Sequence, residues 1–150
     1  MLFSYLFFIS SLSICSLFAY LADKYNSKLV RNLLICFLVL ITGFRSVEVG
    51  IDSANYAEIW DAVLVGIPVF LEVGFQMLIQ FLQRISTNPT ILFVTCSIIT
   101  FDLLIIRLWD FRNVASFTVM ILVLFMLVVM PSMNTMRQYC AVSIVFYGTK

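Results

Sequence analysis

The sequence predicts an all-α fold, a polytopic transmembrane helical bundle of about five to six membrane segments with one amphipathic surface helix. Hydrophobic residues make up 63% of the 150 residues and charged residues only 11%, whereas soluble domains carry about 25% charged residues. The mean hydropathy is +1.09. Such a chain has too little polar surface to cover itself in water, so residues 1–150 should form a single integral membrane domain.

The composition also excludes several functions. The net charge is only +1 and there is no basic run, which argues against nucleic-acid binding. Because the chain has no histidine, acid–base chemistry would fall to carboxylates, arginines or tyrosines. The cysteines lie in apolar runs without CxxC spacing, so we expect buried apolar residues, no metal and no cofactor. They are Cys15, Cys36, Cys96 and Cys140.

The first two membrane segments are predicted at residues 1–21 and 29–44. No basic residue precedes the first apolar run, so it should be a retained helix and not a signal peptide. Lys24, Lys28 and Arg31 mark the connection between the segments as cytoplasmic by the positive-inside rule. The following polar segment would then lie on the outer side.

That outer segment should contain a short amphipathic helix on the membrane surface. Asp52 or Ser53 can cap its start, and Gly66 and Pro68 should end it. Its apolar face would carry aromatic and aliphatic residues, and the opposite face would carry two acids. The apolar residues are Tyr56, Ile59, Trp60 and Val63, and the acids are Glu58 and Asp61.

A polar stripe marks the next helix, predicted over residues 72–85. Such groups are costly against lipid, so they should point into protein or a hydrated cavity. The stripe consists of Glu72, Gln76, Gln80 and Gln83. The Glu72 carboxylate needs a partner, for which an ion pair with Arg45 or Arg137 is one interpretation and a general base is the other.

Two more membrane segments are predicted at residues 90–106 and 114–130. Asp102 should pair with Arg107 or lie at the interface, and Asp110 should be solvated. Pro131 should close the second of these segments, with a new helix starting near Ser132 or Asn134.

The sidedness of the chain depends on residues 72–85. If that helix crosses the membrane, Arg137 is inside; if it dips without crossing, Arg137 returns to the side of Asp52. We favour the second arrangement, because it also places the basic connection 107–113 in the cytoplasm.

Arg137 is a candidate anion ligand. It lies three residues after Asn134 at the start of a helix, where free N–H groups and the helix dipole favour negative charge. A guanidinium adds a forked donor pair that fits two phosphate oxygens. An interface arginine contacting lipid headgroups is the alternative, and the sequence leaves both open.

A series of short motifs resembles the EpsG-like branch of the Wzy-type bacterial polysaccharide polymerases. The motifs are GFR at 43–45, VGID at 49–52, NY at 55–56, EVGF at 72–75 and MNTMRQ at 133–138. The matching positions are Arg45, Gly50, Asp52, Tyr56, Glu72, Gly74, Phe75, Asn134, Arg137 and Gln138. Ile51 replaces the usual threonine and leaves the polar positions intact. Members of that family are longer, so we expect the N-terminal part of such a polymerase.

The resemblance implies a multi-pass glycosyltransferase of the bacterial inner (plasma) membrane, active in its full-length form, that joins repeat units carried on undecaprenyl diphosphate. Arg137 and Arg45 would hold the diphosphate, and Glu72 or Asp52 would activate or position the acceptor hydroxyl. Substrate binding would involve Tyr56, stacked on a sugar, together with Asn134 and Gln138. Implied partners are the undecaprenyl-diphosphate-linked oligosaccharide, membrane lipid, a flippase and a chain-length regulator.

Two alternatives remain open at this point. The first is a transporter or flippase component, although the sequence lacks the paired broken helices that transporter folds favour. The second is an inactive truncated fragment that inserts into the membrane but lacks the remainder of the site.

Overall fold

The computed structural model describes residues 2–46 and 52–149, and this part of the chain is helical throughout its regular structure. The all-α prediction is therefore confirmed. The helices are α1 (Leu2–Tyr25), α2 (Lys28–Gly43), α3 (Ser53–Val65), α4 (Val73–Gln83), α5 (Thr90–Asp110), α6 (Phe117–Leu124), the π-helical turn η1 (Phe125–Val129), α7 (Met130–Ser132) and α8 (Met136–Gly148).

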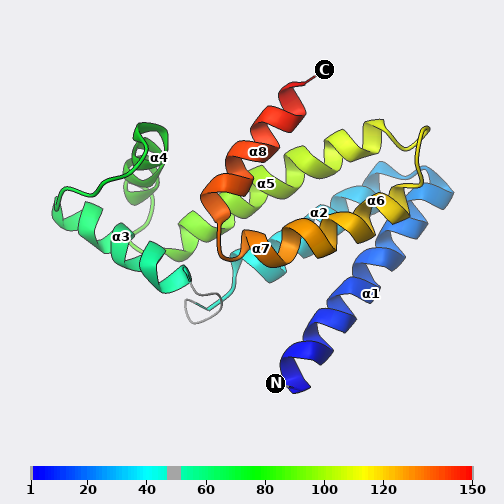
Figure 1. Ribbon diagram of the computed structural model, residues 1–150, viewed down its shortest axis with the longest axis horizontal. Helices are drawn as coiled ribbons and strands as arrows, with labels where there is room; N and C mark the ends of the chain where they lie inside the picture. Colours follow the sequence, from blue (N-terminus) through cyan, green and yellow to red (C-terminus); the bar gives the residue numbers. More distant parts are fainter. Residues whose placement is uncertain (1, 47–51, 150) are drawn as a thin grey trace.

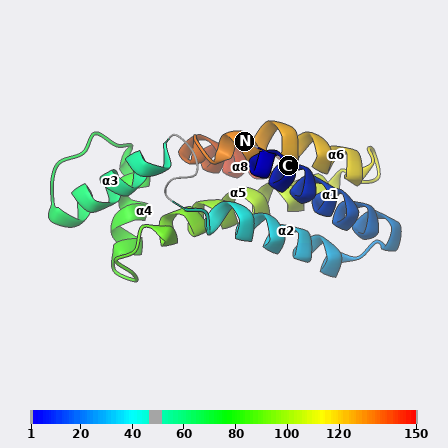
Figure 2. The ribbon, with the colours of Figure 1, turned by 90° about the horizontal axis from the view of Figure 1, so that it is seen from below.

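The bundle is built around α5. Helices α2 and α8 both pack along α5, while α1 packs against α2 and α6. Helices α3 and α4 lie together beside the N-terminal end of α5, and the α1–α2 and α5–α6 connections lie at the opposite end (Figures 1 and 2). The bundle thus has two distinct ends, which we call the α3–α4 end and the hairpin end.

The membrane character is carried by long apolar helices. Two helices within the described residues are long and apolar enough to cross a membrane, Tyr5–Tyr25 and Thr90–Asp110, and Phe117–Ser132 is apolar but shorter. Helix α4 has 11 residues and is about 16 Å long at 1.5 Å per residue. It is too short to span about 30 Å of hydrocarbon. The full number of membrane segments stays a prediction.

Two hydrophobic cores correspond to the two parts of the bundle. The larger core joins α1, α2, α5 and α6, with Leu34, Phe101 and Phe117 fully enclosed. The second core joins α3, α4 and the start of α5 around Trp60 and Phe93. Three cysteines are buried as predicted. Cys36 is exposed, because its position on α2 faces away from the bundle.

Helices α2 and α5 approach each other most closely near Gly43. A Cβ atom on Gly43 would lie only 2.9 Å from the Cα of Val94, so glycine permits the contact. One residue earlier, the buried Thr42 hydroxyl donates to Leu38 O at 2.7 Å and is hydrogen-bonded to Ser97 Oγ at 3.0 Å. This contact fixes the C-terminal end of α2, after which Arg45 follows.

Several predicted boundaries and pairings were wrong. The apolar helix continues through Pro131 to Ser132, because a π-helical turn precedes the proline, and the next helix begins at Met136. Helix α5 continues to Asp110, which brings Arg107 one turn from that residue. Arg107 Nη1 therefore lies 3.6 Å from Asp110 Oδ2, so its ion-pair partner is Asp110 and not Asp102.

Helix α3 ends at the predicted glycine but has a different environment from the one expected. Gly66 ends it with a left-handed φ of 81°, which glycine adopts without strain. The aromatic face was expected to lie on the membrane surface. Instead Tyr56 and Trp60 are buried against the protein, and Trp60 Nε1 donates to Thr87 O at 3.0 Å.

Candidate functional site

The centre of the candidate site is an ion pair between residues distant in the sequence. Arg137, on the first turn of α8, donates from Nη1 to Glu72 Oε2 at 2.5 Å. Glu72 immediately precedes α4, where its backbone is extended (φ −61°, ψ 135°). The side chains are 35% exposed for Arg137 and 72% for Glu72. Of the two partners predicted for Glu72, Arg137 is the one observed.

Two aromatic rings flank the Arg137 guanidinium. Its central carbon lies 5.9 Å from the ring centroid of Tyr56 and 5.7 Å from that of Phe75, within reach of a cation–π attraction. The two rings meet edge to face with centroids 6.1 Å apart. The two rings hold the guanidinium between α3 and α4. The ion pair is therefore positioned by packing as well as by the attraction between its two charges.

Arg45 occupies a second, buried position at the same end of the bundle. It is only 9% exposed, and its Nε donates to Ser53 Oγ at 3.2 Å while its Nη1 donates to Thr42 O at 3.4 Å. Its guanidinium lies 4.8 Å from the ring centroid of Phe93. Burial lowers the pKa of Arg45 from its usual value, which leaves an arginine still charged.

One donor of Arg45 has no partner in the described part of the chain. Its Nη2 atom is buried and makes no hydrogen bond within residues 2–46 and 52–149, whereas nearly all buried polar groups in proteins are hydrogen-bonded. Arg45 therefore keeps one unused donor in this part of the chain.

The Glu72 carboxylate is held in its ionised form. Its pKa lies below the usual value, first because a backbone hydrogen bond at Glu72 itself stabilises the charge, and then because of the Arg137 guanidinium. A carboxylate in this state accepts hydrogen bonds and does not donate them. Glu72 is thus suited to orienting a hydroxyl group of a ligand.

The other predicted site residues lie nearby in less defined positions. Asp52 is half-buried and precedes α3, but its side chain does not cap the helix. Asn134 is half-buried in the turn between α7 and α8, and Gln138 is exposed next to Arg137. Gly50, one of the positions that match the family motifs, lies outside the described residues.

The polar stripe of α4 is only partly turned inward. Gln83 donates from Nε2 to Trp60 O at 2.8 Å, but Gln80 is exposed. The described residues contain no group of three or more histidines, cysteines or acids placed to hold a metal ion.

Sequence reasoning missed three contributors to the site. Phe93 lies under Arg45, and Ser53 and Thr42 supply oxygens to the same guanidinium. Neither Phe93 nor Thr42 stands out among the apolar residues around it, and Ser53 is predicted only as a helix cap. The signal that could have found them is Arg45 itself, because an arginine that becomes buried requires oxygen acceptors nearby.

The fold and this site define a class: a helical membrane protein with a cationic and aromatic polar site at one end of its bundle. Comparison with known families matches residues 28–150 to the EpsG family. The chain belongs to the EpsG family, which confirms the resemblance seen in its motifs. Neither the curated proteins nor the solved structures contain a match to this chain.

Proposed function

We propose that this protein acts in a polysaccharide repeat-unit polymerase of the bacterial inner membrane. The reaction would transfer a glycan from undecaprenyl diphosphate to the hydroxyl of an acceptor sugar. Membership of the EpsG family supports a role in polysaccharide synthesis. The observation that carries the proposal is the Arg137–Glu72 ion pair, which joins a cation suited to phosphate with a carboxylate suited to a hydroxyl.

The chemistry requires one bond to form and one to break. The acceptor oxygen attacks the anomeric carbon of the donor sugar, the bond from that carbon to the diphosphate oxygen breaks, and the hydroxyl proton leaves to a carboxylate. Negative charge accumulates on the leaving diphosphate. Two arginines placed to meet that charge would stabilise the transition state most strongly in a site that excludes water. We assign this role to Arg137 and Arg45, the latter through its Nη2, which makes no hydrogen bond with residues 2–46 and 52–149.

The resting ion pair gives the site an exchange step. A diphosphate oxygen would take the place of Glu72 on the Arg137 fork, because guanidinium binds phosphate with two parallel hydrogen bonds. Glu72 would then be released toward the acceptor hydroxyl, with Asp52 as the other candidate carboxylate. Phe75 is half-buried beside Arg137 and would pack against a sugar face. Tyr56, which was expected to stack on a sugar, is only 5% exposed and would instead support the Arg137 guanidinium. Asn134 and Gln138 would contact the substrate.

The test is an Arg137→Ala substitution in the complete polymerase, expressed in cells that depend on it. We expect long-chain glycan to disappear while single repeat units accumulate on the lipid at the outer face of the membrane. The matched control is Arg84→Ala, because Arg84 is an exposed arginine at the end of α4. Normal long chains in the Arg137 variant would refute the assignment.

The same experiment separates polymerisation from transport. If the protein moved lipid-linked units across the membrane, its loss would leave them on the inner face. The face on which they accumulate can be read with a membrane-impermeant glycan label. Co-purification of the polymerase would test the proposed association with a flippase and a chain-length regulator.

A further inference from the structure

A second basic and aromatic cluster lies at the hairpin end, remote from Arg45 and Arg137. Its centre is Trp109, a residue only 3% exposed that meets Phe117 edge to face with ring centroids 5.0 Å apart. Two guanidiniums lie over its indole: that of Arg31 at 5.6 Å and that of Arg112 at 4.6 Å from the ring centroid. The two arginines come from α2 and from the α5–α6 connection.

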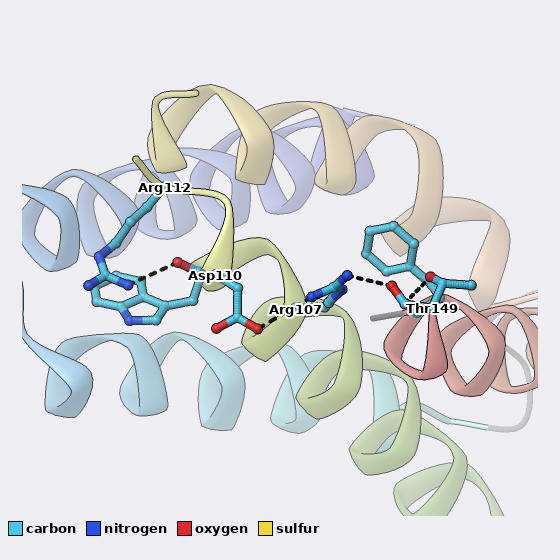
Figure 3. Close-up of polar contacts among 6 residues, drawn as sticks. Arg107, Asp110, Arg112 and Thr149 are labelled. Carbon is cyan, nitrogen blue, oxygen red and sulfur yellow. Dashed lines mark hydrogen bonds and ion pairs between the residues drawn. The ribbon is translucent and has the colours of Figure 1, made fainter. Parts of the chain in front are cut away.

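These two arginines lack acidic partners in the described part of the chain. No carboxylate among residues 2–46 and 52–149 forms an ion pair with either of them; the nearby Asp110 pairs with Arg107 instead. Figure 3 shows Arg107 directed toward Asp110 and Thr149, with Arg112 on the far side of Asp110. Two like charges are thus held near one ring without an ion-pair partner in the described part of the chain.

Both guanidiniums are only partly used by the protein. Arg112 donates from Nη1 to Trp109 O at 3.1 Å. Arg31 donates from Nε and Nη2 to the amide oxygen of Asn32, at 3.1 and 2.8 Å. That forked contact to one exposed neutral oxygen is the contact that a phosphate oxygen would make more strongly. Both side chains are half-buried, so solvent and lipid can reach them.

The surroundings add positive charge and membrane character. Lys24 and Lys28 are exposed at the same end and outnumber the half-buried Asp23 beside them, and the first turn of α2 contains no acid. The buried indole is a ring type that favours the depth of lipid headgroups. Basic pockets between membrane helices on the cytoplasmic side bind headgroups with several phosphates.

We propose that Arg31 and Arg112, held on Trp109, form a binding site for an anionic phospholipid with two phosphates in one headgroup, the cardiolipin class. The guanidinium carbons lie no farther apart than the sum of their distances to the indole centroid, so two linked phosphates can engage one arginine each. The bound headgroup would connect the α1–α2 hairpin to the α5–α6 connection. This proposal is independent of the polymerase proposal.

The test uses the full chain purified in a neutral detergent and supplied with cardiolipin, phosphatidylglycerol or phosphatidylcholine. Native mass spectrometry counts the lipids retained. We expect cardiolipin to be retained at least about 10-fold better than phosphatidylcholine, and the Arg31→Gln/Arg112→Gln double variant to lose this preference. Arg84→Gln is the control, because it removes an exposed arginine at the α3–α4 end, away from the proposed site.

Two further measurements keep the outcome decisive. A thermal midpoint equal to that of the wild type, measured without lipid, shows that the double variant is folded. If the double variant is not folded, the single variant Arg31→Gln is used in its place. An excess of inorganic diphosphate should leave bound cardiolipin in place, since the acyl chains contribute to binding. Equal cardiolipin retention by variant and wild type would overturn the proposal, as would release of the lipid by diphosphate alone.

Discussion

An arginine contacts an aromatic ring at each end of the α2–α5 pair, but one arginine is buried and the other lies at the surface. At the α3–α4 end Arg45 lies 4.8 Å from the ring of Phe93, and at the hairpin end Arg112 lies 4.6 Å from that of Trp109. Arg45 is 9% exposed and has hydroxyl and carbonyl acceptors around it. Arg112 is half-buried and bonds a carbonyl at the bundle surface.

The comparison teaches that burial, and not the ring contact, sets the role of each arginine. A charge removed from water costs several kcal/mol unless it is paired, so a buried arginine with a free donor is maintained at a cost to stability. An arginine at the surface carries little such cost and can respond to whatever anion arrives. Substitution of the buried arginine at the α3–α4 end should therefore abolish function. Substitution of a surface arginine at the hairpin end should have little effect on stability.

The largest expected effect is that of Arg45→Met in the complete polymerase. Loss of one preorganised cation should reduce long-chain glycan about 100-fold or more. Stability should stay the same or rise by about 1 kcal/mol, because an apolar side chain of similar length avoids burying a charge. Glycan length on gels and the thermal midpoint in detergent measure the two quantities.

Arg84→Met serves as the control for Arg45→Met, since it removes an exposed arginine. A fall in stability together with the loss of glycan would instead make Arg45 a structural residue. Wild-type glycan in the variant would remove it from the site altogether.

The second effect concerns the contact that positions Arg45. A Cβ on Gly43 would lie 2.9 Å from backbone Cα of Val94, so Gly43→Ala should separate α2 from α5 and cost about 1–3 kcal/mol. Gly74→Ala should stabilise α4 by about 0.5–1 kcal/mol, because nothing lies within 4 Å of its added Cβ and alanine favours helix. Thermal midpoints of the two variants that shift in the same direction would contradict this account.

Much of the helical order could be predicted from the sequence because its signals are local. Apolar runs and Gly66 place most helix ends within a few residues of the observed ones. The cost of an unpaired carboxylate also predicted an ion pair of Glu72 with Arg45 or Arg137, and the pair with Arg137 is observed. The helix end predicted at Pro131 was wrong because a π-helical turn lets the helix pass through the proline, and no residue pattern indicates such a turn.

Packing partners could not be predicted, because they depend on contacts between distant segments. The aromatic face of α3 was assigned to the membrane surface, since periodicity shows that a face is apolar but not what covers it. The choice of Arg137 over Arg45 as the partner of Glu72 likewise depends on where α8 begins.

A smaller effect is expected for Trp60→Phe in the second core. Trp60 is fully buried and donates from Nε1 to Thr87 O at 3.0 Å. Losing that bond and part of the ring should cost about 1–2 kcal/mol, mainly in the packing of α3 on α4. Proteolysis within residues 66–72 should become faster, while Phe70→Ala, at a fully exposed ring, should leave stability within about 0.5 kcal/mol.

The smallest effect is expected for Thr42→Val, which removes the hydroxyl between α2 and α5 while keeping the shape of the side chain. Leu38 O keeps its helical N–H partner, and Ser97 can turn its hydroxyl to a carbonyl of its own helix, so the cost should be about 0.5–1 kcal/mol. Arg45 is bonded to the Thr42 carbonyl and not to the hydroxyl, so glycan length should not change. If glycan is lost as in Arg45→Met, then the hydroxyl, and not the backbone, holds the buried arginine in place.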